Sequence, residues 1–257
     1  MKTLLKSKLT LLLTKDKEVQ ALVVGYDYVT NNLVAQVNDK RALLAHDDIS
    51  VYQNSKNTDD EIHKLIGSTI NCTIIGKNKN DILLSRKQVM QKRINEHEKG
   101  DVVEATIVSA SNNALYLEFD EGLVGKMYIN QITASKLERP LDLYNVGDKI
   151  KCIILKKQDD GRFLLSRLSL YKSEDFNIQL GNIVKCRITQ KVKEDPGYFV
   201  EVVSNPLYSG IFDINQYNRN NIYNVGDTIS LRVVEIKSNK QLKFRTNHSC
   251  TYAKSAR

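Results

Sequence analysis

Two predicted strands near the middle of the chain turn aromatic and basic side chains away from an apolar face. In residues 115–119 and 126–129, apolar residues alternate with other types, which is typical of half-buried strands. The residues expected to face inward are Leu115, Leu117, Phe119, Met127 and Ile129. Tyr116, Lys126 and Tyr128 would then face outward, where rings can stack on bases and a cation can contact a phosphate. The alternative is that both are ordinary strand tyrosines without a ligand.

A second set of rings and cations lies nearer the C-terminus. Phe199 and Glu201 are expected to face outward from a strand whose inward residues are Tyr198, Val200 and Val202. Three cations follow in a later predicted strand: Lys240, Lys243 and Arg245. Residues 180–257 hold 12 Lys or Arg and 6 Asp or Glu, a net charge of +6. The three cations are equally consistent with contacts to a nucleic-acid backbone and with a solvated strand edge.

The elements that carry these residues belong to an internal repeat. Gly67, Gly147 and Gly226 are spaced by 80 and 79 residues, and each precedes a strand-like run. The first two repeats end in the same four residues, Leu-Leu-Ser-Arg, at 83–86 and 164–167. A second glycine signature opens the later two units at residues 99–108 and 180–188.

Each unit of about 70 residues reads as five short strands rich in β-branched residues. Units this small barely form a two-sheet sandwich, whereas a five-stranded barrel removes most free strand edges. The sequence therefore predicts an all-β protein of three tandem five-stranded OB-fold barrels joined by short helical linkers. The expected domains are residues 1–86, with a leader of about 15 residues packed on the first barrel, 99–168 and 180–247. The linker 85–98 is predicted to be a short helix and the linker 166–179 to be similar.

Composition favours a polyanionic partner and gives no sign of catalysis. The net charge is +8 and the pI is near 9.1, which suits nucleic acid, although solubility alone is an alternative. No apolar run reaches the roughly 18 residues of a membrane span, and few, widely spaced cysteines suit a reducing cytoplasm. The cysteines at 72, 152 and 186 occupy repeat positions that also accept Leu or Ala, which predicts buried structural thiols.

No cofactor or metal site is expected. There is no CxxC pair, and the four histidines, at 46, 63, 97 and 248, are scattered without ligand spacing. The adjacent Asp pairs at 47–48, 59–60 and 159–160 lie in predicted turns, where Asp favours local hydrogen bonds. We therefore expect no catalytic residues and no small-molecule substrate.

The ordered motifs resemble the S-one RNA-binding domain family over about residues 18–247. They are most specific in the second unit, at 122–130, 146–148 and 161–167. The arrangement is especially similar to the N-terminal domains of ribosomal protein S-one of Gram-positive bacteria. The resemblance implies that Tyr116 and Phe199 occupy the position of a base-stacking Phe, and that Arg162 matches an arginine that closes the site. Tyr128 and Asp213 stand where the family has His, and an acid at a phosphate-lined site is unfavourable unless it is paired.

The first unit departs most from this pattern. Val34 stands where the later units have a ring, Asp81 stands near the position of Arg162, and residues 42–47 lack the family glycine. A barrel without aromatic rings and without a cation that closes the site is expected to bind RNA weakly. By resemblance, this unit is expected to be a docking module for the small ribosomal subunit or another protein.

The sequence thus predicts a non-enzymatic cytoplasmic protein that binds single-stranded RNA in translation, with mRNA as the expected strand. Two alternatives remain: a protein–protein interaction role, and an RNA-feeding accessory subunit of a nuclease or polymerase.

Overall fold

The computed structural model contains three closed barrels of five strands each. It describes residues 15–52, 57–78, 81–172, 177–193, 196–214, 223–237 and 241–246. The first barrel comprises β1 (Glu18–Asp27), β2 (Asn32–Val37), β3 (Lys40–Ala45), β4 (Thr69–Asn78) and β5 (Asp81–Ser85). The second comprises β6 (Val102–Ala110), β7 (Ala114–Phe119), β8 (Leu123–Tyr128), β9 (Lys149–Lys157) and β10 (Phe163–Ser166). The third comprises β11 (Ile183–Lys191), β12 (Gly197–Val202), β13 (Ser209–Asp213), β14 (Thr228–Ile236) and β15 (Gln241–Thr246).

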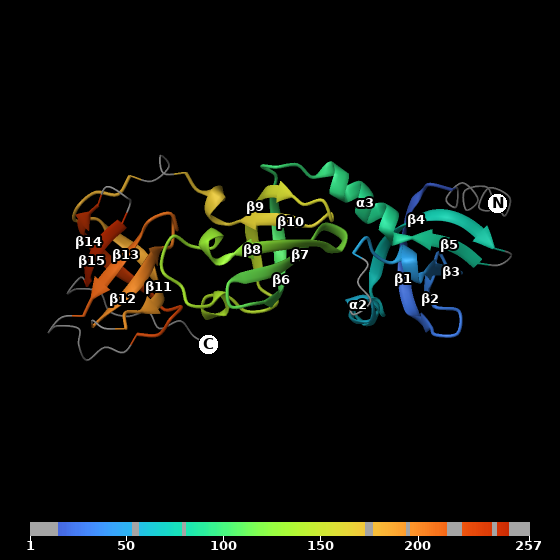
Figure 1. Cartoon of the computed structure of the whole chain (residues 1–257), viewed down its shortest axis with the longest axis horizontal. Coiled ribbons are helices and arrows are strands. Elements are labelled where there is room, and N and C mark those ends of the chain that lie inside the picture. The colour runs from blue at the N-terminus through green and yellow to red at the C-terminus, as the bar shows by residue number, and fades with distance from the viewer. Residues whose placement is uncertain are drawn as a thin grey trace, which may run out of the picture. The chain divides into compact units, whose positions relative to one another are not determined.

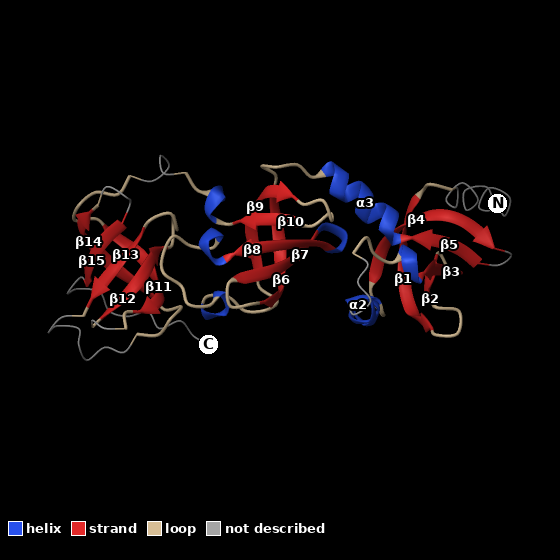
Figure 2. Cartoon of the chain, in the orientation of Figure 1, coloured by secondary structure: helices blue, strands red, loops and turns tan. Residues whose placement is uncertain are grey.

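All three barrels share one topology, which can be followed in Figures 1 and 2. The first strand of each barrel pairs antiparallel with the second and the fourth, and the third pairs parallel with the fifth. Each first strand is bulged at the same point, at Val23/Gly25, Ile107/Ser109 and Ile188/Gln190. A bulge bends a strand, which helps a short sheet close on itself. The predicted fold class is confirmed.

The barrel interiors are filled by the inward residues of the alternating strands. Leu115, Leu117 and Met127 are fully buried, as are Val200 and Val202. The cysteines at 72, 152 and 186 are also fully buried, and burial raises the pKa of the Cys72 and Cys152 thiols to about 12. These three are core residues as predicted, while the fourth cysteine lies outside the described residues.

The two linkers differ. The first forms α3 (Arg86–Glu96), a helix as predicted, and Ser85 Oγ accepts a hydrogen bond from Gln88 N at its start. In the second linker, the described residues form only the 3₁₀ turn η5 (Leu168–Leu170), so the expectation of a similar helix is wrong there. Ser166 Oγ accepts a hydrogen bond from Ser169 N at 3.0 Å, as Ser85 Oγ does from Gln88 N, but the chain leaves helical geometry at Tyr171, which is extended. A further helix, α2 (Asn57–Leu65), was not expected from the sequence.

By contacts the chain divides into two compact units. One contains residues up to 98 together with 120–123 and 158–161, and the other contains 99–119, 124–157 and the residues from 162 onward. The second and third barrels therefore belong to the same unit, apart from two turns of the second barrel.

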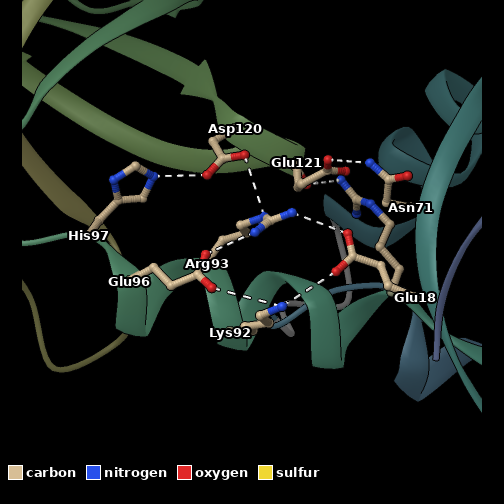
Figure 3. A network of polar contacts seen from close by, with 9 residues as sticks. Glu18, Asn71, Lys92, Arg93, Glu96, His97, Asp120 and Glu121 are labelled. Atoms are coloured by element: carbon tan, nitrogen blue, oxygen red, sulfur yellow. Dashed lines mark hydrogen bonds and ion pairs between the residues drawn. The ribbon is translucent and has the colours of Figure 1, made fainter. Parts of the chain in front are cut away.

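A buried arginine organises the polar contacts of the first unit, part of which is drawn in Figure 3. Arg86, which ends the first Leu-Leu-Ser-Arg segment, is only 4% exposed. Its Nη1 donates to Ile49 O at 3.1 Å and to Glu61 Oε1 at 2.6 Å, and its Nη2 donates to Glu121 O at 2.8 Å. Glu121 also accepts a hydrogen bond from Asn71 Nδ2. One guanidinium group thus ties the end of the first barrel to the turn 120–122.

Arg93 of α3 forms a second, more exposed cluster in the same unit (Figure 3). Its guanidinium nitrogens lie 3.1 Å from Glu18 Oε1, 2.9 Å from Glu96 Oε2 and 3.8 Å from Asp120 Oδ1. His97 Nε2 lies 2.9 Å from Asp120 Oδ2. These contacts fix α3 against β1 and against the turn 120–122.

The second unit repeats the buried-arginine contact between its two barrels. Arg167, at the repeat position of Arg86, donates to Ile132 O at 2.8 Å and to Glu201 Oε2 at 3.1 Å. Arg187 Nη1 lies 3.8 Å from the other oxygen of Glu201. Glu201 was predicted to face outward, but it is fully buried because the second barrel covers that face of β12. Strand alternation tells which face a residue occupies, not what covers that face.

Candidate nucleic-acid interface

The second barrel brings Tyr116, Lys126 and Tyr128 together on its outer surface. Tyr116 lies on β7 and is half-buried, and the other two lie on the neighbouring strand β8, where Tyr128 is 40% exposed. Lys126 Nζ lies 5.5 Å from the ring centroid of Tyr116 and 4.5 Å from that of Tyr128. The ammonium group thus sits within cation–π distance of both rings. We call these three residues the ring–cation cluster.

The packing beneath this cluster explains why β8 carries a glycine. A Cβ added at Gly125 would overlap the side chain of Leu165, which fills the barrel interior. Gly125 is also in register with Phe163 of β10, as Lys126 is with Leu164. Close packing of β8 on β10 therefore holds Lys126 at a defined position on the outer face.

Arg162 immediately precedes β10 and is half-buried. The residue in register with Lys126 is Leu164, so Arg162 lies two residues before that row, at the start of the strand. This end-of-strand position is compatible with the closing role that the family resemblance implies, and that role stays a prediction.

The third barrel carries a related row. Phe199 of β12 is in register with Ile211 of β13, which is in register with Lys243 of β15. Phe199 is half-buried and Ile211 is 38% exposed. Lys243 Nζ lies 3.1 Å from Asp213 Oδ2, so the acid that replaces the family histidine is paired. The cation here comes from the fifth strand of the barrel instead of the third.

The other two predicted cations stand apart from this row. Arg245 is exposed and in register with Arg232 of β14, so it extends a basic edge. Lys240 lies outside the described residues. Sequence reasoning missed Lys136, which follows β8 and whose Nζ lies 4.8 Å from the Phe199 ring centroid. No pattern in the sequence could link a loop of one repeat to a strand of the next.

The first barrel has an apolar row at the same positions. Val34 is in register with Leu43, and Leu43 with Leu83; all three are half-buried. The nearby Asp81 lies 3.9 Å from Arg41. The row therefore contains neither an aromatic ring nor a charge. Its apolar character could have been found by aligning the first repeat with the second, position by position.

Among the described residues, no group of three or more His, Cys, Asp or Glu side chains could hold a metal ion. None of the helices in the described ranges has the length and apolar content needed to cross a membrane.

Comparison with known proteins identifies the second barrel directly. Residues 96–168 match the family model for the S1 RNA binding domain. The same segment contains the ring–cation cluster and the start of β10.

Curated relatives match longer stretches at low identity. A 4-hydroxy-3-methylbut-2-enyl diphosphate reductase of Clostridium acetobutylicum is 25% identical over 205 residues, which cover 71% of this chain and 31% of the reductase. A small ribosomal subunit protein bS1 homolog of Bacillus cereus is 22% identical, covering 66% of this chain and 49% of that protein. A polyribonucleotide nucleotidyltransferase of Lachnoclostridium phytofermentans is 31% identical, covering 35% of this chain and 14% of that enzyme.

The chain thus spans from about a seventh to about half of the length of these relatives. The names of these relatives indicate different functions. The family model and the topology of the second barrel both indicate the same kind of domain. The second barrel is similar to the S1 RNA binding domain family, and the first and third barrels have the same strand topology as the second.

Proposed function

We propose that this protein binds single-stranded RNA through the ring–cation cluster of the second barrel, with the third barrel as a second contact. The observation that carries the proposal is the position of Lys126 Nζ, 4.5 Å and 5.5 Å from the Tyr128 and Tyr116 ring centroids. Aromatic faces accept any base by stacking, and a cation beside them can meet the phosphate that follows. Binding should therefore be tolerant of sequence and sensitive to salt.

The biological setting we propose is translation in the cytoplasm, with mRNA as the bound strand and the small ribosomal subunit as a partner. The similarity to the bS1 homolog supports this setting. We further propose that the chain has no catalytic activity of its own and needs no cofactor. The match to the reductase covers only 31% of that protein, so it does not argue for reductase activity here.

The test is a salt titration of binding to a fluorescently labelled, unstructured RNA. Each stacking ring removed should cost about 1–3 kcal/mol, so Tyr116→Ala with Tyr128→Ala should weaken binding strongly. Lys126→Ala should weaken binding less and reduce the slope of log K against log salt by about 0.7. Tyr28→Ala is the matched control, because Tyr28 is 75% exposed and lies in the turn that follows β1 of the first barrel.

Two results would contradict this proposal. An RNA affinity that does not change with ionic strength would exclude phosphate contacts as the source of binding. Affinity that survives removal of both tyrosines, while Tyr28→Ala has the larger effect, would exclude the ring–cation cluster as the binding surface.

A second candidate function concerns the first barrel, which we propose docks on a protein. The row Val34–Leu43–Leu83 supports this, because apolar side chains there replace the ring and cation of the second barrel. Co-sedimentation with small ribosomal subunits should be weakened by Leu43→Asp and should persist after nuclease treatment of unprotected RNA. Loss of co-sedimentation on nuclease treatment would show that RNA alone mediates the association.

Alternatively, the first barrel docks on a nuclease or polymerase, and the chain acts as an accessory subunit that feeds RNA to that enzyme. The match to the nucleotidyltransferase, which covers 14% of that enzyme, favours this alternative. A pull-down that recovers a nuclease instead of ribosomal subunits would select it. Hydrolysis of RNA by the purified chain would contradict the proposed absence of catalysis.

A further inference from the structure

A lysine of the second barrel lies against the predicted stacking ring of the third. Lys136 belongs to the segment between β8 and β9, and its Nζ lies 4.8 Å from the ring centroid of Phe199. Both barrels belong to the same compact unit. Phe199 takes the place in β12 that Tyr116 takes in β7, so each of the two rings has an ammonium group beside it. In the second barrel that ammonium comes from the same barrel, whereas here it comes from the neighbouring one.

The two residues that precede Lys136 form hydrogen bonds to the third barrel. Ser135 Oγ and Thr189 Oγ1 are 2.7 Å apart, and Thr189 Oγ1 also donates to Phe199 O at 3.1 Å. Ala134 N donates to Pro206 O at 3.2 Å. Thr189 is 1% exposed, so this link is part of a buried junction and not a surface encounter. These hydrogen bonds hold the two residues just before Lys136 against the third barrel.

The lysine itself is available to a ligand. Lys136 is exposed, and within the part of the chain that the structure describes no carboxylate lies within ion-pair distance of its ammonium group. An exposed cation over an aromatic ring gains little from the ring alone. A phosphate beside a base stacked on Phe199 would give it a stronger partner.

The Lys136–Phe199 contact is also close enough to the ring–cation cluster for one RNA strand to bind both. Lys136 lies eight positions after Tyr128, and a chain of that length spans less than about 29 Å even when fully extended. The 3₁₀ turn η3 (Ile129–Gln131) shortens this path. One RNA strand of modest length can therefore reach both rings.

We propose that Lys136 and Phe199 form a composite nucleotide site, built by the second and third barrels together, on which an RNA strand bound at the ring–cation cluster continues. Lys136 contacts a phosphate and Phe199 stacks on the adjoining base. This inference rests on the proposed RNA-binding function and adds a specific site to it. It also means that the two barrels bind one strand as a single surface.

The test measures the binding of the full chain to an unstructured 20-nucleotide RNA as salt is varied. Lys136→Ala should weaken binding about fourfold at 0.15 M salt and lower the salt slope by about 0.7. Phe199→Leu should weaken binding roughly 5- to 150-fold and leave the slope unchanged, because it removes the ring but keeps the apolar packing. Lys136→Arg should restore wild-type binding. Lys149→Ala is the matched control, since Lys149 is exposed on β9, which pairs with neither β7 nor β8.

The outcomes separate this inference from the proposed function. If the wild-type chain fails to bind the RNA at all, both are wrong. If it binds with a normal salt slope but Lys136→Ala and Phe199→Leu behave like wild type, the composite site is wrong and the ring–cation cluster stands. Tighter binding by Lys136→Ala would also overturn the inference, because it would show that the lysine blocks the ring.

Discussion

Neutralising Glu201 should loosen the third barrel far more than neutralising an exposed acid of the same barrel. The Glu201 side chain is 0% exposed and lies 3.1 Å from Arg167, whose side chain is 9% exposed. Breaking a buried ion pair by removing one partner costs about 3–5 kcal/mol, because the other charge stays buried and uncompensated. Glu201→Gln should fall in the upper part of this range, since Arg187 lies 3.8 Å away and leaves two cations facing a neutral amide.

The suitable assay is native-state hydrogen exchange of the amides of β12, because it reports local opening in a chain with several barrels. A change of about 3–5 kcal/mol corresponds to roughly 140- to 3,700-fold faster exchange. The control is Asp213→Asn, which breaks the Lys243 pair, where the side chains are 46% and 49% exposed. An exposed pair contributes about 0–1 kcal/mol, so this variant should exchange almost as wild type does.

A double variant sharpens the test. Arg167→Met combined with Glu201→Leu removes both buried charges together, and such replacements are often neutral or stabilising. We therefore expect it to recover most of the protection lost in Glu201→Gln. Two results would show that the buried ion pair does not stabilise the third barrel. One is an equal increase in exchange rate for Glu201→Gln and Asp213→Asn, and the other is the fastest exchange of the three in the double variant.

Three further predictions concern the barrels individually. The double variant Val34→Tyr with Leu43→Lys copies the Tyr116–Lys126 pair into the first barrel. This variant should bind a second RNA strand. An unchanged RNA-to-protein stoichiometry in calorimetry would refute the equivalence of these positions in the first and second barrels. In a Cys250→Ser chain, the three buried thiols should react with a thiol reagent at pH 8 at least about a hundredfold more slowly in the folded protein than in urea. The reason is that burial raises the pKa of each of these thiols. Equal rates would show that the thiols are accessible in the folded protein. Gly210→Ala should destabilise the third barrel by about 1–3 kcal/mol in urea unfolding, because its Cβ would collide with the backbone of Leu242. Gly25→Ala should have little effect, because nothing lies within 4 Å of a Cβ at that position.

The barrels were predictable from the sequence because their signals are local. The spacing of Gly67, Gly147 and Gly226 fixes the repeat, and a period of two predicts most of the residues that fill each interior. Ile129, which was predicted to face inward, is an exception, because it lies in η3 and is only half-buried. The same period correctly turned Tyr116 and Tyr128 away from the core. These features depend only on neighbours along the chain, so they need no knowledge of tertiary structure.

The contacts between repeats were not predictable in this way. The Leu-Leu-Ser-Arg segments were visible in the sequence, but nothing in them revealed that Arg86 and Arg167 would be buried. Glu201 was expected to be outward because alternation is silent about a neighbouring barrel. Lys136 reaches Phe199 across 63 positions of the sequence, counted from 136 to 199. Only the folded chain brings such pairs together.

The most direct test of the account is to map where an RNA strand lies on the protein. An unstructured RNA that carries a photoreactive uracil analogue should be cross-linked to the full chain, and the modified peptides should be identified by mass spectrometry. We predict cross-links in β7 and β8, at Tyr116 and Tyr128, that disappear at high salt. Cross-links confined to the first barrel, with β7 and β8 unmodified, would contradict the central claim.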